Sequence, residues 1–104
     1  MNPFAGEVSV PVDGKPVRAR LTLGALAELE TALEAGTLVD LVERFETGRF
    51  SSRDVLAVVV AGLRGGGWQG TAADLRTADI GGGPVGAARV AAALLVRAFA
   101  LPGD

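Results

Sequence analysis

The most constraining feature of this sequence is its longest apolar run, residues 55–63, which read Val-Leu-Ala-Val-Val-Val-Ala-Gly-Leu. Ser51 and Asp54 stand just before the run, and Arg64 and three glycines follow it, so the sequence predicts a helix with clear start and stop signals. At about 100° per residue, its large apolar side chains spread over one broad face. Because an ordinary surface helix has a narrower stripe, we expect the other elements to surround this helix. The side chains of that face are Val55, Leu56, Val58, Val59, Val60 and Leu63.

The composition narrows the chemistry that this chain can perform. At 104 residues it is long enough for one core, so we expect a single domain over residues 1–104. The absence of Cys and His removes disulfides, thiolate ligands and the commonest general base, so we expect no enzyme, no cofactor and no metal site. A net charge of −2 disfavours a nucleic-acid partner. No leader or bilayer-spanning run is visible, so we expect a cytoplasmic protein without a membrane partner.

A β-hairpin is predicted over residues 7–21. Two apolar–polar alternating segments, 7–12 and 15–21, flank Asp13 and Gly14, which together favour a two-residue type I′ turn. With these two residues in the turn, the facing pairs are Val12 and Lys15, Val10 and Val17, and Val8 and Ala19. Pro11 then faces Pro16 at a pair that is not hydrogen-bonded across the ladder, where a missing amide does no harm. Since two strands alone are marginally stable, this hairpin must pack on helices.

Helices are predicted over residues 23–100, so the expected fold is α+β and mainly α, with the hairpin packed on a bundle of four or five helices. Thr22 is a good N-cap for a helix at about 23–35, and Gly36 ends it. Further helix starts are marked by a Ser or Thr with Asp three positions later, the pattern of a capping box. These pairs are Thr37 and Asp40, Ser51 and Asp54, and Thr71 and Asp74. The last two helices are expected at about 72–79 and from Pro84 to about 99 or 100.

The apolar spacing also predicts which side of each helix faces the core. The inward residues of the first helix are expected to be Leu23, Leu26, Leu29 and Leu33, and those of the second Leu38, Leu41, Val42 and Phe45. The last helix is expected to turn Val85, Ala88, Ala92, Leu95, Val96 and Phe99 inward. A second stripe on that helix, Val90, Leu94 and Leu101, falls on roughly the opposite side. It is either buried within the monomer or in contact with another chain, and we favour the contact because few elements are left to cover it.

Two glycine-rich segments, 65–70 and 81–86, formally match the dinucleotide fingerprint G-x-G-x-x-G. That fingerprint needs a strand before it and a helix after it, whereas both segments follow predicted helices. We interpret them as flexible loops between helices. A helix-turn-helix is also disfavoured, because its recognition helix at 72–79 carries two acids and one Arg.

Trp68 and an acidic segment are further candidates for partner contact. Trp68 is the only Trp, and it either folds over the end of the core or anchors a partner. Residues 22–46 carry six acids against one base, including Glu28, Glu30 and Glu34. This acidic segment is either a solvated face or a docking surface for a basic partner.

Two stretches of the sequence match a pattern seen in a known family. The first, residues 6–30, has Gly6, Glu7 and Val8, then Asp13 and Gly14, then an unbroken match over 20–30. The second has matches at 43–45, 52–55 and 61–67, the last reading Ala-Gly-Leu-Arg-Gly-Gly-Gly. Together they resemble a small family from the tail gene clusters of gene transfer agents and related siphophage-like tails. The resemblance extends over about residues 6–100 and is weakest over 69–84.

The resemblance implies a non-catalytic role between the tail tube and the tape measure protein. We expect a tail assembly chaperone that binds the tape measure protein during assembly, with the tail tube protein and a second copy of the chain as further partners to test. The alternative is a structural tail component, a tube or terminator subunit retained in the particle. Tube proteins are usually rich in strands because their rings close through β-sheets, and only residues 7–21 here are predicted to be strand.

Overall fold

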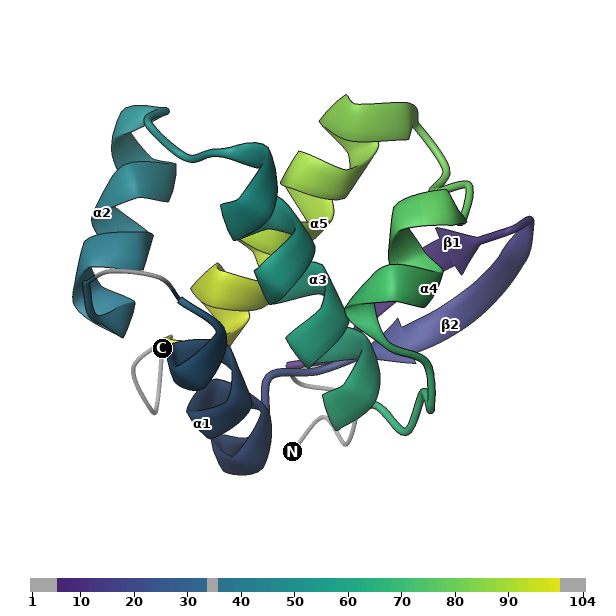
Figure 1. Cartoon of the computed structure of the whole chain (residues 1–104), viewed down its shortest axis with the longest axis horizontal. Coiled ribbons are helices and arrows are strands. Elements are labelled where there is room, and N and C mark those ends of the chain that lie inside the picture. The colour runs from purple at the N-terminus through teal and green to yellow at the C-terminus, as the bar shows by residue number, and fades with distance from the viewer. Residues whose placement is uncertain (1–5, 34–35, 100–104) are drawn as a thin grey trace.

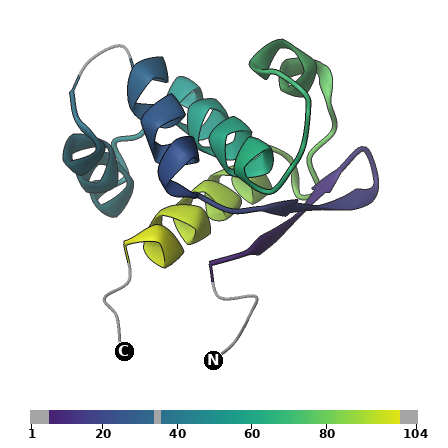
Figure 2. The same cartoon turned by 90° about the horizontal axis from the view of Figure 1, so that it is seen from below.

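The computed structural model describes residues 6–33 and 36–99. Its elements, in order, are β1 (Val8–Val12), β2 (Lys15–Ala19), α1 (Leu23–Ala32), α2 (Leu38–Thr47), α3 (Ser52–Gly65), α4 (Ala72–Thr77) and α5 (Gly83–Ala98). The fold is therefore α+β and mainly α, as the sequence predicts. Figures 1 and 2 show α1 beside α3, α5 crossing on the far side of α3, and α2 and the hairpin at opposite ends of the molecule.

The helix predicted to be central, α3, is the one around which the chain is arranged. It contacts α1, α4, α5 and β2. Val58, Val59 and Leu63 are almost completely buried on it, and so are the small residues Ala61 and Gly62. Neighbours cover α3 on several sides, which is why its apolar face is wider than that of a surface helix.

The hairpin has the predicted register at every position, from Val8 opposite Ala19 to Val12 opposite Lys15. Asp13 and Gly14 have φ angles of 51° and 80°, the positive values that a type I′ turn requires at both positions. The buried side chains of Val10 and Ala19 join the core, so the hairpin is stabilised by the helices rather than by its own ladder.

The helix starts are also confirmed. The Thr22 hydroxyl accepts a hydrogen bond from the Ala25 amide, and capping boxes at Thr37, Ser51 and Thr71 open α2, α3 and α4. The predicted end of the first helix was too late, since α1 ends at Ala32. The rest of that prediction, residues 34–35, lies outside the described residues.

One element of the fold was missed by the sequence analysis. Residues 79–81 lie along the outer edge of β1, where Ile80 bridges Val12. The Asp13 amide donates to the Asp79 carbonyl at 2.8 Å, and the Gly81 amide donates to the Pro11 carbonyl at 3.0 Å. Because the chain has to extend to reach this edge, α4 ends at Thr77 and not at 79 as predicted.

The two glycine-rich segments join helices as interpreted, but the first two glycines of the first segment pack closely against the backbone at and just after β2. A Cβ on Gly65 would collide with the carbonyl oxygen of Arg20, and one on Gly66 would collide with that of Arg18. The Arg20 amide also donates to the Gly62 carbonyl at 2.7 Å, so the end of α3 lies directly on the backbone of β2. These glycines are places where two backbones meet closely.

The predicted inward face of the last helix is right at Leu95, which is buried, but wrong at Val85, Val96 and Phe99, which are exposed. The buried residues of α5 are Ala91, Leu94 and Leu95, whereas Val85 and Val96 are 63% and 70% exposed. Small alanines on all sides of α5 leave its apolar pattern almost uniform, so packing sets the rotation. The deciding contact is with Gly62 of α3, where an added Cβ would lie 2.6 Å from Cδ1 of Leu94.

The prediction of which residues of the first helix face the core also has one error. Leu23 was expected to face the core, but it is 85% exposed. The inward face of α1 is built on Ala25 and Leu29, one turn apart, with Leu26 and Leu33 partly buried beside them. Leu23 precedes Ala25 by two residues, which places it about 200° away around the helix.

Candidate functional site

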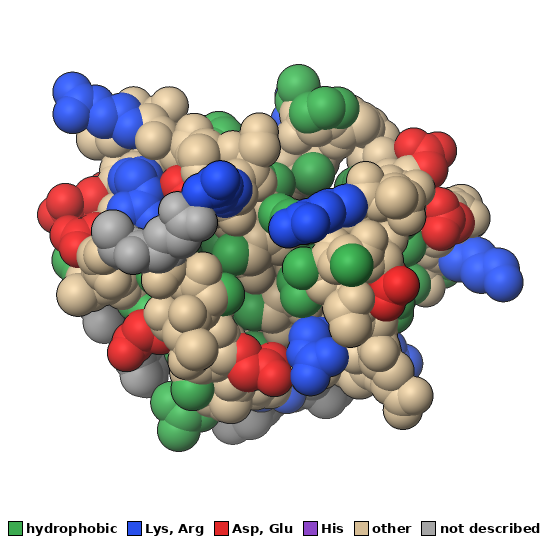
Figure 3. Space-filling model, in the orientation of Figure 1, with side chains coloured by type: hydrophobic (Ala, Val, Ile, Leu, Met, Phe, Trp, Pro, Cys, Tyr) green, Lys and Arg blue, Asp and Glu red, His purple; other side chains and the backbone are tan. Residues whose placement is uncertain are grey.

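An open groove of about 970 Å³ lies between α1, α3 and α4 and reaches the end of α2. Its apolar lining includes Leu56, Ala57 and Val60 of α3 and Leu33 just after α1, all partly buried. Figure 3 shows hydrophobic side chains in the hollow near the centre of this face, with basic side chains on both sides of it. We name this feature the α1–α3–α4 groove.

Basic residues gather around the α1–α3–α4 groove. Five of the ten Lys and Arg residues of the chain line it. They are Arg44, Arg49, Arg53, Arg64 and Arg76. Of the acidic residues in the described part of the chain, Glu28 and Asp54 line it. Among the described residues that line the groove, basic side chains therefore outnumber acidic ones.

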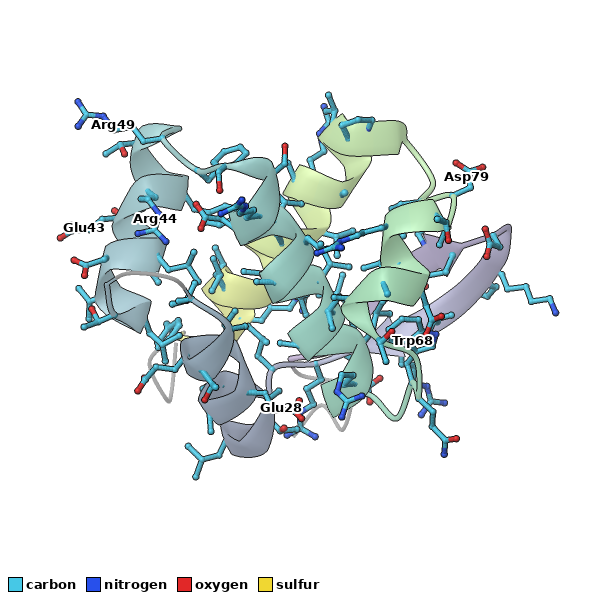
Figure 4. The ribbon with its side chains drawn as sticks, viewed as in Figure 1. Glu28, Glu43, Arg44, Arg49, Trp68 and Asp79 are labelled. Carbon is cyan, nitrogen blue, oxygen red and sulfur yellow. The ribbon has the colours of Figure 1, made fainter. Side chains whose placement is uncertain are left out.

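The wall between α2 and α3 is held by a two-point ion pair between Arg44 and Asp54. Arg44 Nε lies 3.0 Å from Asp54 Oδ2 and Nη2 lies 3.0 Å from Oδ1, a geometry in which the guanidinium plane matches the carboxylate. Oδ2 also accepts the Ser51 amide at 2.9 Å, so Asp54 caps α3 as well. Figure 4 shows Arg44 reaching from α2 toward α3.

The electrostatics of this pair follow from its position. Burial raises the pKa of Asp54, but the hydrogen bonds from Arg44 and Ser51, with the Arg44 charge, outweigh it and lower the pKa overall. The hydrogen bonds to Asp54, together with the charges of Asp54 and Asp40, raise the pKa of Arg44 and outweigh the opposite effect of burial. Asp54 is thus a structural anion that fixes the groove wall.

A second ion pair closes the other end of the groove. Arg64 Nη2 lies 3.2 Å from Oε1 of Glu28, and Arg64 Nη1 donates to the Gly70 carbonyl at 3.1 Å. These contacts join α1, α3 and the segment before α4. The side chains of Arg64 and Glu28 are 41% and 52% exposed, so the pair adds little to stability and mainly orients the two groups.

The residues that the sequence analysis named as candidate partner contacts have different surroundings in the structure. Glu28 is engaged by Arg64, Glu30 is exposed on α1, and Glu34 lies outside the described residues. Trp68 is partly buried and packs against the core, and its ring covers Gly70 so closely that a Cβ there would collide with it. This is the arrangement in which Trp68 folds over the end of the core.

The two described residues of the second stripe, Val90 and Leu94, pack against the core. Leu94 is 0% exposed and sits against Gly62 inside the monomer, so its expected position on the outside of the helix is wrong. Val90 is partly buried and packs against the core, and Leu101 lies outside the described residues. A contact with another chain through Leu94 would require α5 to leave α3.

The sequence analysis missed the groove itself. It placed Leu56 and Val60 on the core face of α3, which was reasonable for apolar residues one turn apart. It gave no role to Arg53 or Arg76, which line the same groove from α3 and α4. The groove depends on how far apart α1 and α4 lie in the folded chain. That distance cannot be inferred from a single sequence.

The described residues contain no cluster of three or more potential metal-ligating His, Cys, Asp or Glu side chains. The helices in this part of the chain include none long and apolar enough to cross a membrane.

No curated protein and no solved structure matches this chain significantly. A family model described as "Phage tail tube protein, GTA-gp10" matches residues 5–101, nearly the whole chain. That family is one of tail proteins rather than of enzymes, and the match agrees with the resemblance found at 6–30 and 43–67. The chain therefore belongs to the GTA-gp10 family of gene transfer agent tail proteins.

Proposed function

We propose that this chain is a non-catalytic tail assembly chaperone that binds the tape measure protein in the cytoplasm of the cell producing the particle. Tape measure binding keeps a long, apolar, largely helical protein from aggregating until the tube forms around it. A chaperone of this type needs apolar and charged surface and no catalytic groups, which suits a chain without His or Cys.

The observation that carries the proposal is that other parts of the chain pack against both sides of the hairpin. Residues 79–81 bond to the outer edge of β1 at Pro11 and Asp13. On the other side of the hairpin, the end of α3 packs against β2, and the Arg20 amide just after β2 donates to the Gly62 carbonyl. A ring subunit that joins its neighbours through β-sheets needs an open strand edge, and these contacts already occupy part of the hairpin.

The family description favours a second candidate, a tail tube subunit retained in the particle. Such a subunit would use its helices, rather than strands, to contact its neighbours, or would rearrange the hairpin on assembly. The helical content of the fold gives this candidate less support than the chaperone.

Co-expression tests the proposal. A tagged copy of this chain is expressed with and without the tape measure protein of the same particle, and the soluble fractions are purified on the tag. We expect the tape measure protein to become soluble and to co-purify only when the tagged chain is present. A tape measure protein that is equally soluble alone and never co-purifies would contradict the chaperone role.

A further inference from the structure

We propose that the exposed face of α5 binds α2 of a second copy of this chain in a head-to-tail contact. In such a contact the two surfaces that meet are different, so each copy offers α5 to one neighbour and α2 to another. The inference goes beyond the proposed function, because it concerns the chain by itself and does not depend on the tape measure protein.

The first observation is that α5 has apolar residues on two sides, of which the chain covers one. Leu94 and Leu95 are buried, whereas Val85 and Val96 are mostly exposed. Val85 and Val96 are eleven positions apart, so they point in directions that differ by only about 20°, and the half-buried Ala92 lies between them. A helix with apolar residues on opposite sides is usually covered on both. The exposed side of α5 is therefore a candidate contact surface.

The charges on α5 are all positive. The helix carries Arg89 and Arg97, both exposed, and no acidic residue. Arg89 points within about 40° of Val85, so it lies on the exposed apolar side. Neither arginine forms an ion pair with another described residue. A partner that presents carboxylates beside an apolar side chain would complement this surface, and a basic partner would be repelled.

The outer side of α2 has this complementary character. Val39 is 67% exposed, and Glu43 and Glu46 are exposed at the i+4 and i+7 positions, on the same side of the helix. Neither glutamate has an ion-pair partner among the described residues. The one base of α2, Arg44, is held by Asp54. Figure 4 shows Glu43 pointing outward from α2, away from α3.

The two surfaces also match in spacing. Val39 and Glu43 are four residues apart on α2, and Val85 and Arg89 are four residues apart on α5. If the two helices lie side by side in the same direction, Val39 packs on Val85 and Glu43 meets Arg89 in one alignment. In the opposite direction, Glu43 beside Arg89 would place Val39 beside Ala93. The same-direction alignment is therefore the one that we propose.

The positions of the two surfaces favour a contact between copies. The first turns of α5 follow residues 79–81, which bond to β1. The hairpin and α2 lie at opposite ends of the molecule in both views (Figures 1 and 2). The acidic and basic surfaces are thus separated within one chain, and a second copy brings them together.

Sedimentation of the purified chain tests for self-association. A contact made by two helices falls below about 1,200 Å², the range of weak and transient interfaces, so association should depend on concentration. We expect the average mass to rise above that of the monomer between about 10 µM and about 1 mM. It should fall again as salt is added, because the attraction is partly between exposed charges.

Charge reversal locates the contact. Arg89→Glu and Glu43→Arg should each weaken self-association at least about tenfold, because like charges then face each other. An equimolar mixture of the two variants should associate about as tightly as the wild type, since the two reversed charges attract and so do the two native ones. Arg18→Glu and Glu30→Arg make the same changes at exposed positions of β2 and α1 and should have less than about a twofold effect.

Disulfide cross-linking tests the alignment independently of charge. Because the chain contains no Cys, Val39→Cys and Val85→Cys each introduce a single thiol at an exposed position. We expect a mixture of these two variants to form a linked heterodimer on mild oxidation, since facing residues come within the distance of about 7 Å between Cα atoms that a disulfide allows. Arg18→Cys mixed with Glu30→Cys is the control and should give far less product.

Three results would overturn the inference. The first is a wild-type chain that stays monomeric at about 1 mM. The second is self-association that persists in both charge-reversed variants, which would mean that copies meet through other surfaces. The third is a mixture of those variants that stays monomeric and a Val39→Cys and Val85→Cys pair that links no better than the control. Because these experiments use the chain alone, and co-expression tests the tape measure protein, the inference and the proposed function can fail separately.

Discussion

At the scale of single residues, Asp54 has two structural roles. Its carboxylate caps α3 through the Ser51 amide and holds Arg44 through two hydrogen bonds of 3.0 Å. The sequence predicts the first role from the spacing of Ser51 and Asp54. It does not predict the second, because the pairing with Arg44 depends on how α2 packs beside α3.

The pKa of Asp54 leads to a prediction on acid stability. Its pKa is lower in the folded chain than in the unfolded chain, where the pKa of an Asp is about 3.9. Its contribution to stability is therefore complete above that value and is lost as the pH falls through the folded pKa. We expect Asp54→Asn to lower the free energy of unfolding by about 1–2 kcal/mol at pH 7.

Urea unfolding at a series of pH values checks this prediction. The difference between wild type and Asp54→Asn should shrink as the pH is lowered from about 5 toward 3, because the wild-type carboxyl becomes neutral. A difference that stays constant over that range would show that the charge of Asp54 is irrelevant to stability.

The hairpin turn gives a second prediction at this scale. Gly14 has a φ of 80° and no heavy atom within 4 Å of an added Cβ, so Gly14→Val introduces backbone strain without a collision. We expect a loss of about 1–3 kcal/mol in the free energy of unfolding. Gly24→Ala, inside α1, is the control and should be neutral or slightly stabilising. Equal melting temperatures for wild type and Gly14→Val would argue against the two-residue turn.

At the scale of elements, the fit between α3 and α5 decides what is buried. Leu94 occupies the space that Gly62 leaves on α3, and this contact turns Val96 toward solvent. Knob-and-hole contacts of this kind set the rotation of an alanine-rich helix, whose own apolar pattern is too uniform to do so.

Two substitutions on α5 test this arrangement. Leu94→Asp places an unpaired carboxylate in the core, which costs several kcal/mol and is comparable to the whole stability of a small domain, so we expect it not to fold cooperatively. Val96→Asp, two residues away on the 70% exposed side, should change the free energy of unfolding by less than about 0.5 kcal/mol. Circular dichroism melts compare the two. If both variants melt like the wild type, or if both fail to fold, the rotation of α5 described above is wrong.

The elements also show which parts of the fold are visible in the sequence. The hairpin register and the helix starts can be predicted from neighbouring residues. Asp13 and Gly14 indicate the turn, and Ser51 with Asp54 indicates a helix cap. The rotation of α5, the strand-like segment at 79–81 and the α1–α3–α4 groove depend on contacts between distant residues. Gly62 and Leu94 are 32 positions apart in the sequence, and nothing local marks one as the hole for the other.

For the whole molecule, the edges of the hairpin and the α1–α3–α4 groove bear on different ways in which this chain could contact other proteins. Residues 79–81 bond to part of the β1 edge, and the end of α3 packs beside β2, so part of the hairpin is already used within the chain. The α1–α3–α4 groove is open, and apolar and charged side chains line it. This combination fits a protein that holds a tail component temporarily better than one that builds the tube.

The composition of purified particles tests that account most directly. Quantitative mass spectrometry of intact particles gives the copy number of this chain relative to the tape measure protein and to the protein that forms the tube wall. A chaperone released before completion should be absent from the particles, or far below one copy per tube ring, while it is abundant in extracts of the producing cells. If this chain is instead present in the particles in as many copies as the tube wall requires, it is a tube subunit and the chaperone account is wrong.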